Sequence, residues 1–153
     1  LGSRIVDLNS TSKVDYWVVD KTGVGQGVYD RLREMSYPVR GVSFGEKSED
    51  AQYQNLKAEW HFRFRKWLVS GGKLKRDYGW NELEMVKYKH KDSKIIIQPK
   101  EDLFREGTAS PNCVDAAVLT MVINDQSIKS SRMIKQMQGR PFHDETTRIW
   151  RNE

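Results

Sequence analysis

Two aspartates occupy positions where a carboxylate could take part in ligand binding or catalysis. Asp20 directly follows residues 14–19, a β-branched and aromatic run with the length and composition of a buried strand. Ligands of open α/β sheets bind at the carboxyl ends of the strands, where Asp20 is expected. Asp115 is expected within the first turns of a later helix. Each also has a purely structural interpretation, Asp20 as a turn residue and Asp115 as an acid favoured by the helix dipole.

The residues that follow Asp20 predict a strand–helix–strand unit. A glycine-containing turn comes first, and Pro38 is expected to end the helix because the residue before a proline avoids the helical region. Residues 39–44 then read as a second strand. This spacing predicts a right-handed parallel crossover. The apolar positions that indicate the helix are Val28, Leu32 and Met35.

The next segment predicts a long helix and then a hairpin. Gly71 and Gly72 are expected to end the helix, and Asn81 to cap a short helix at 82–85. Residues 86–91 alternate apolar and basic side chains, and residues 94–97 read as a second strand after a short turn. This pattern predicts a β-hairpin with one basic face. The apolar residues at helical spacing in the long helix are Tyr53, Leu56, Trp60, Phe64, Trp67 and Leu68.

The last predicted helices surround Asp115. Residues 99–106 predict a short helix, and Ser110 and Pro111 are expected to cap and begin the next one. Val114, Val118 and Met121 would line its apolar side, leaving Asp115 off that stripe. We expect residues 1–123 to form one α/β domain, and 124–153 to be a polar tail that is mobile or separately docked.

Composition excludes several classes of protein. The chain has 153 residues, a net charge of +5 and a single cysteine, Cys113, which rules out an internal disulfide or a cysteine-based zinc cluster. No apolar run approaches the length of a membrane span and no signal peptide is recognisable, so a reducing cytoplasm is expected. The basic surplus permits a nucleic-acid partner. Cations that could follow DNA phosphates, or equally form a solvated surface, are Lys73, Lys75, Arg76, Lys87, Lys89 and Lys91.

Other candidate sites are weaker. Residues 23–27 contain three glycines, but they lack the ribose-binding acid of a dinucleotide loop. Cys113 has no obvious catalytic partner in the sequence. The three histidines share no ligand spacing and are interpreted as ordinary surface residues: His61, His90 and His143.

Four segments together resemble the nuclease domain of viral large terminase subunits. Residues 20–32, DKTGVGQGVYDRL, resemble its second acidic motif, and 53–72 resemble its next segment. Residues 97–107 and 110–117 resemble its closing block, in the same order and at similar spacing. The resemblance covers about residues 14–123. It implies a ribonuclease H-like fold, with a mixed sheet flanked by helices, and a domain that cuts concatemeric double-stranded DNA during viral packaging.

The same resemblance implies a metal-dependent site. The family gathers acids around two divalent ions, Mg²⁺ or Mn²⁺, which can stabilise both the attacking and the leaving oxygen of a phosphodiester. Asp20 and Asp115 match two of these acids, and Lys100 is a candidate for electrostatic support. The implied partners are double-stranded DNA, the terminase small subunit, the portal and the packaging ATPase domain, in the cytoplasm of a bacterial host.

Three departures from the family pattern limit this interpretation. The family's first acid has no match, because 19 residues precede Asp20 and the acids among them, Asp7 and Asp15, lie in the wrong context. Asn112 stands where the family often has another acid, and no phosphate loop of a packaging ATPase is present. We therefore expect an N-terminally incomplete nuclease domain with weak or no activity as this fragment. The alternatives are a non-enzymatic basic module that binds DNA or a packaging protein, and another enzyme of the same superfold, such as a junction resolvase.

Overall fold

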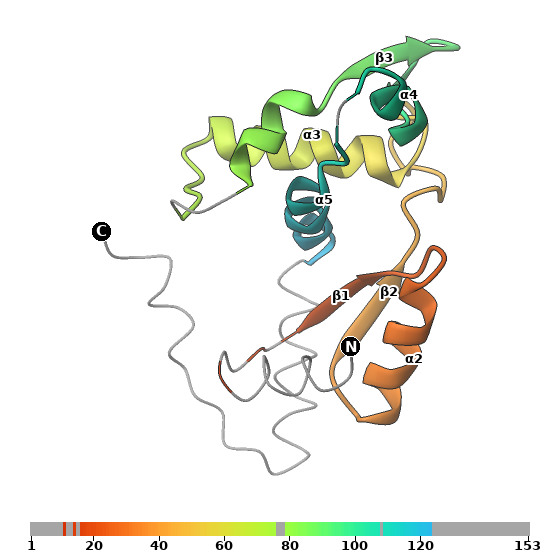
Figure 1. Cartoon of the computed structure of the whole chain (residues 1–153), viewed down its shortest axis with the longest axis vertical. Coiled ribbons are helices and arrows are strands. Elements are labelled where there is room, and N and C mark those ends of the chain that lie inside the picture. Colours follow the sequence, from red (N-terminus) through yellow and green to blue (C-terminus); the bar gives the residue numbers. More distant parts are fainter. Residues whose placement is uncertain (1–10, 12–13, 15, 76–78, 108, 124–153) are drawn as a thin grey trace.

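The structure is a computed structural model. It describes residues 11, 14, 16–75, 79–107 and 109–123 (Figure 1). The predicted tail and Arg76 lie outside these residues, as do Asp7, Asp15 and His143. The proposed domain boundary at residue 123 therefore stays a prediction.

The first unit is the predicted parallel crossover, and the structure confirms it. Strand β1 (Trp17–Asp20) leads into helix α2 (Gly25–Glu34), and strand β2 (Val39–Val42) returns beside β1 in parallel. Leu32 is fully buried between the helix and the strands, as its spacing predicts. Asp20 is the last residue of β1 rather than the residue after it, and it lies at the end where the chain turns toward α2.

The long helix is shorter than its apolar spacing predicts. Helix α3 (Leu56–Val69) begins after Asn55, whose side chain accepts a hydrogen bond from the Ala58 N–H at 3.1 Å and so caps the helix. Tyr53 lies outside it and forms an isolated parallel bridge with Ile95. The cap explains the difference, because Asn55 itself has extended backbone angles (φ −153°, ψ 173°) and the helix can begin only after it.

The predicted hairpin is present. Strands β3 (Tyr88–Lys91) and β4 (Lys94–Ile97) pair antiparallel, and Asp92 and Ser93 make the two-residue turn with positive φ angles of 49° and 64°. All four residues of β3 are exposed, whereas β4 buries Ile95 and Ile97. The hairpin thus rests on β4 and presents β3 to solvent.

The remaining elements correct two predicted caps. Helix η1 (Trp80–Met85) is a 3₁₀ helix that starts from Gly79 at φ 89°, so Asn81 lies inside it and does not cap it. Helices α4 (Lys100–Arg105), α5 (Asn112–Leu119) and η2 (Thr120–Val122) follow. Ser110 does not cap α5: its hydroxyl donates to Asn112 Oδ1. The cap comes instead from Glu82 of η1, which accepts from the N–H groups of Cys113 at 2.7 Å and Val114 at 3.3 Å.

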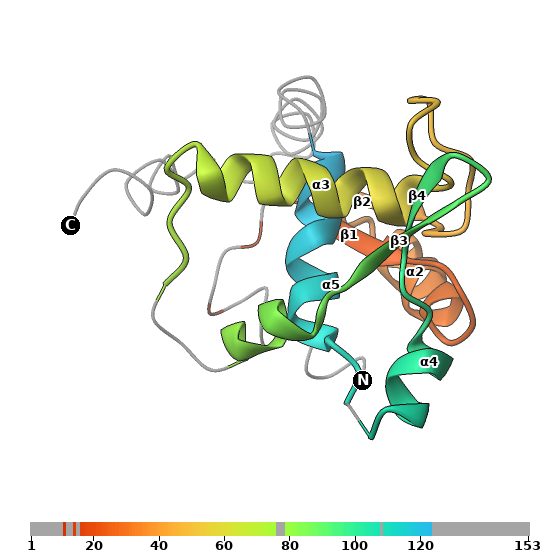
Figure 2. The ribbon, with the colours of Figure 1, turned by 90° about the horizontal axis from the view of Figure 1, so that it is seen from above.

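Helix α5 lies at the centre of the molecule. It contacts α3 on one side and β1 on the other. Figure 1 shows it between the crossover unit and the part formed by α3, η1, the hairpin and α4, and Figure 2 shows α3 crossing over it. The described residues form a mixed α/β fold with two separate two-stranded sheets, and the single mixed sheet expected from the sequence is not seen among them. Within these ranges no helix is long and apolar enough to cross a membrane. The buried core residues around α5 are Val42, Trp60, Phe64, Val114, Val118 and Val122.

Candidate functional site

Asp115 is buried between α5 and α3, which corrects the prediction that it lies off the packed side of its helix. Only 8% of its surface is exposed. Its neighbours Val114 and Val118 are also buried, so the packed side of α5 is wider than an apolar stripe of three residues indicates. A buried carboxylate requires compensation by nearby positive charge or hydrogen bonds.

Three nitrogen-bearing side chains provide that compensation. Lys57 of α3 lies 3.3 Å from Asp115 Oδ1, and Lys100, the first residue of α4, lies 3.1 Å from Oδ2. His61, one turn after Lys57, places Nε2 3.3 Å from Oδ1. Burial would raise the pKa of Asp115, but the hydrogen bond from His61 and the charges of Lys57 and Lys100 outweigh it and lower the pKa to about 2. Asp115 is therefore an ionised, acceptor-only group at neutral pH.

Two of these partners were absent from the predicted site. His61 was interpreted as a surface residue, whereas it is 7% exposed and contacts Asp115. Lys57 is not among the predicted site residues, yet its ammonium group contacts Asp115. The spacing of Lys57 and His61 at positions i and i+4 of one helix was the available signal, since such residues share a face. Lys100 lies beside Asp115, and its supporting role stays a prediction.

Asp20 lies in a different local setting. One of its oxygens, Oδ1, accepts hydrogen bonds from the Thr22 N–H at 3.0 Å and the Thr22 hydroxyl at 2.7 Å. The turn interpretation of Asp20 is therefore correct as far as Oδ1 is concerned. The start of α2 comes so close that a Cβ at Gly25 would lie 1.7 Å from the Asp20 carbonyl oxygen. Gly25 is thus required to bring the helix start to the end of β1.

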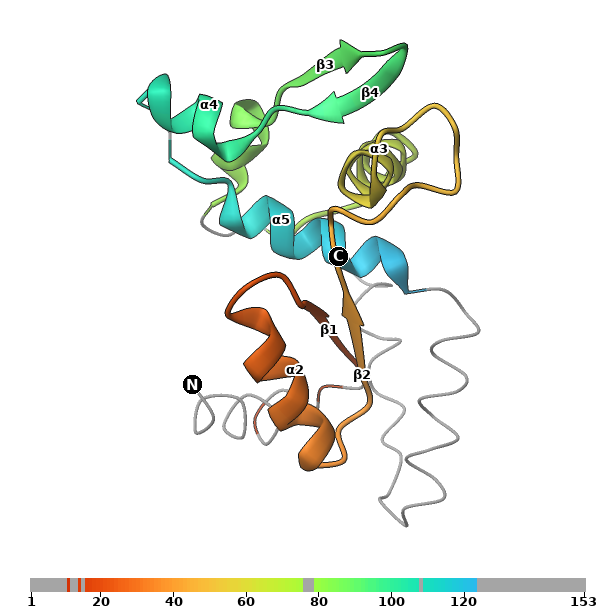
Figure 3. The same ribbon diagram turned by 90° about the vertical axis from the view of Figure 1, so that its right-hand side faces the viewer.

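The arrangement of the elements is compatible with a shared site. Figure 3 shows β1 beneath α5, and α5 contacts β1. The convergence of the Asp20 and Asp115 carboxylates itself stays a prediction. Carboxylate oxygens fit a hard divalent cation that keeps several of its waters. Among the described residues, no group of three or more acidic, histidine or cysteine side chains is placed to hold a metal ion.

The predicted DNA-binding cations lie on exposed segments, and some have acidic partners. Lys73 and Lys75 are exposed in the segment after α3. Lys87 pairs with Glu106 at 2.9 Å and Lys89 with Asp102 at 3.1 Å, while Lys91 is exposed at the end of β3. The positive charge of the hairpin lysines is therefore partly neutralised by Asp102 of α4 and by Glu106, the residue after α4. Its role in DNA contact stays a prediction.

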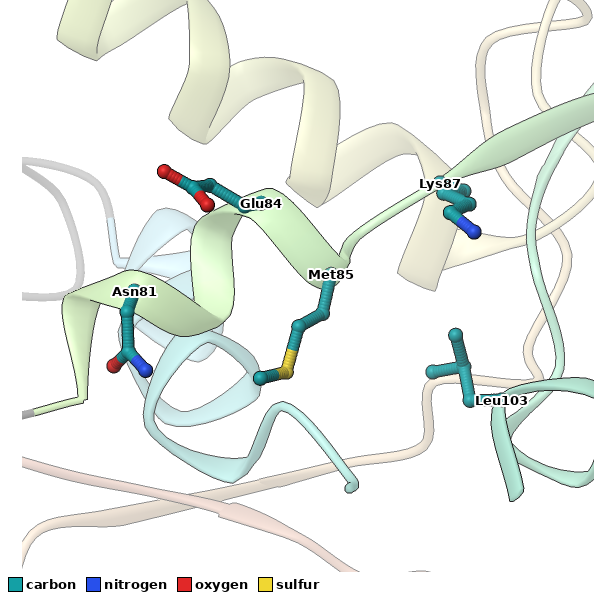
Figure 4. A pocket seen from close by; sticks show the side chains of 5 residues that line it. All are labelled: Asn81, Glu84, Met85, Lys87 and Leu103. Atoms are coloured by element: carbon teal, nitrogen blue, oxygen red, sulfur yellow. The ribbon is translucent and has the colours of Figure 1, made fainter. Parts of the chain in front are cut away.

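A cavity of about 290 Å³ lies between η1, the start of β3 and α4 (Figure 4). Its lining includes neither Asp115 nor its three partners, so it is separate from the acidic site. The lining combines one acid and one lysine with apolar and amide side chains and shows no convergent set of catalytic groups. The residues are Asn81, Glu84, Met85, Lys87 and Leu103.

Comparison with known proteins finds similarity at the level of structure. No family model matches the sequence, and no curated protein matches it. The nuclease domain of the large terminase subunit gp2 of bacterial virus Sf6 superposes with a TM-score of 0.61 at 17% identity, over 78% of this chain and 70% of that chain. A lysine-to-alanine mutant of that domain, with manganese and beta-thujaplicinol, gives a TM-score of 0.60 at 19% identity over the same shares. The chain has the fold of a phage terminase nuclease domain, as its sequence motifs predict.

Proposed function

We propose that this chain is a divalent-metal-dependent DNA endonuclease domain of ribonuclease H-like fold that acts in viral DNA packaging. The observation that carries the proposal is Asp115. A carboxylate that is kept ionised while buried, beside two lysines and a histidine, occurs here in a chain with the fold of a phage nuclease domain. Perturbed carboxylates of this kind concentrate at functional sites.

Asp20 and Asp115 would hold the metal. Bound divalent ions supply stabilisation of the charge that develops on the attacking and leaving oxygens of a phosphodiester. The side chain of Lys100 is 40% exposed, so its ammonium group can turn from Asp115 toward a phosphate when a metal ion binds the carboxylate. Its charge would then offset that of the DNA backbone, which is what electrostatic support requires.

The wider role follows from the same proposal. The substrate is double-stranded DNA, contacted through the exposed lysines, with Mg²⁺ or Mn²⁺ as cofactor. The terminase small subunit, the portal and the packaging ATPase are proposed partners, and the cytoplasm of a bacterial host is the proposed location. These assignments are supported by the fold, by the basic surplus and by the motif order.

A second function has one observation in its favour. The described residues lack a three-membered group of metal-binding side chains, which suits a non-enzymatic module that binds DNA or a packaging protein. Such a module would use the exposed lysines alone. Its DNA binding would need no divalent ion and would not change when Asp20 or Asp115 loses its charge.

The two functions are separated by incubating the chain with supercoiled plasmid in Mg²⁺, in Mn²⁺ and with a chelator. The enzyme predicts nicked or linear product in Mn²⁺, none with chelator, and none for Asp20→Asn or Asp115→Asn. The binding module predicts retarded but intact plasmid in every condition. Cutting that persists in chelator, or in both variants, would contradict the proposed active site.

A further inference from the structure

His61 is the most deeply buried of the three partners of Asp115. Its side chain is 6% exposed, compared with 19% for Lys57 and 40% for Lys100. The ring is part of the buried side of α3, next to the core residues Trp60 and Phe64. A buried ring has few alternative rotamers, whereas a lysine ammonium on a four-carbon stem can withdraw toward water.

The chemistry of the contact fixes which group donates. Asp115 is ionised, because two lysines lie beside it, and an ionised carboxylate only accepts hydrogen bonds. The proton between His61 and Asp115 must therefore be on the His61 Nε2, which donates to Oδ1 over 3.3 Å. This bond restrains the rotation of the carboxylate about its own bond to Cβ.

The two lysines and a metal ion would compete for the same carboxylate oxygens of Asp115. Lys57 approaches both oxygens of Asp115, at 3.3 Å and 3.4 Å, and Lys100 approaches Oδ2 at 3.1 Å. A divalent ion that binds Asp115 would occupy space near these ammonium groups, and like charges would drive them apart. His61, which is buried and needs no charge to donate, is the partner that can stay in place.

We propose that His61 is a positioning residue, which holds the Asp115 carboxylate in the orientation needed to bind a divalent ion. The inference rests on the proposed metal-dependent function and deepens it. His61 touches neither the metal nor the DNA in this account. Hydrogen-bond partners of metal ligands typically contribute ~10–100-fold in metal affinity or activity, and His61 should do the same.

The structure allows variants that keep the fold. His61 also borders a cavity of about 270 Å³ whose lining includes Phe62, Leu83 and Val114, so a different side chain has space at this position. His61→Leu removes the donor and keeps an apolar body, while His61→Gln keeps an amide donor of similar reach. His90 lies on the exposed strand β3, so His90→Leu is a matched control for loss of a histidine.

Mn²⁺ affinity measured by electron paramagnetic resonance of the free ion tests the proposal without DNA. His61→Leu should bind Mn²⁺ ~10–100-fold more weakly, at an unchanged thermal midpoint. His61→Gln should regain most of the affinity, and His90→Leu should match the wild type. If His61→Leu unfolds, His61→Phe, which keeps an aromatic ring and also lacks the donor, takes its place in the comparison with His61→Gln and the wild type.

Asp115→Asn separates the failure of this inference from failure of the proposed function. If Asp115→Asn loses Mn²⁺ and His61→Leu binds it like the wild type, the positioning role is overturned and the metal site stands. If Asp115→Asn binds Mn²⁺ normally, both are overturned. In plasmid cutting, His61→Leu should need more Mn²⁺ for half-maximal rate, while the KM for DNA stays unchanged. A raised KM for DNA instead would contradict the inference.

Discussion

Replacing Asp115 with asparagine should reveal how much its charge contributes to folding. The reference pKa of 3.8 falls to about 2 in the folded chain, and each unit of pKa is about 1.36 kcal/mol. The ionised Asp115 therefore stabilises the fold by about 2 kcal/mol at pH 7. Because the pKa is lowered on folding, this contribution is complete above the unfolded pKa and disappears as the pH falls through the folded pKa. By the same relation about 1 kcal/mol remains at pH 3.

The assay is urea unfolding of wild type and Asp115→Asn at pH 7, 5, 4 and 3. The variant should be less stable at pH 7, and the difference between the two proteins should shrink by about 1 kcal/mol between pH 7 and pH 3. Asp30→Asn, at an exposed position on α2, controls for removing a negative charge from a basic protein. A difference that is constant with pH, or a variant more stable than wild type at pH 7, would refute the reasoning. The second result would mean that burial of the charge outweighs its three partners.

Three further perturbations have defined outcomes. Gly25→Ala should destabilise the fold by ~1–3 kcal/mol or more in urea unfolding, because the added Cβ would lie 1.7 Å from the Asp20 carbonyl oxygen. Gly27→Ala is the control: a Cβ there has nothing within 4 Å, so this variant should be neutral or stabilising. Glu82→Ala should cost about 1 kcal/mol of stability by removing the cap of α5, and the exposed Glu84→Ala should cost far less. Replacing Lys87, Lys89 and Lys91 with alanine should lower the slope of log DNA affinity against log salt by roughly 2.7, and an unchanged slope would make the hairpin a solvated surface.

Local spacing predicted the elements that position Asp20. Val28, Leu32 and Met35 correctly indicate α2, and the run after Pro38 correctly indicates β2, because both signals lie within a few residues. The hairpin is equally local, with Asp92 and Ser93 between its strands. The resemblance to terminase nuclease motifs then predicted a fold that the structural comparison supports at 17–19% identity.

The surroundings of Asp115 could not be predicted in the same way. Lys57 and His61 lie 58 and 54 residues before it in the chain, so no periodicity connects them. The cap of α5 is also distant, since Glu82 lies 31 residues before Cys113, and the nearer Ser110 offered a false local solution. In each case packing against another element decides the outcome, and that information lies outside any short window of sequence.

The central claim is that Asp20 and Asp115 bind one divalent ion together. Crystals of this chain soaked in Mn²⁺ and measured at the manganese absorption edge test it directly. The account predicts an anomalous peak within coordination distance, ~2.0–2.3 Å, of a carboxylate oxygen from each aspartate, with His61 Nε2 still bonded to Asp115. A manganese peak elsewhere, with the two carboxylates on opposite sides of the fold, would contradict it.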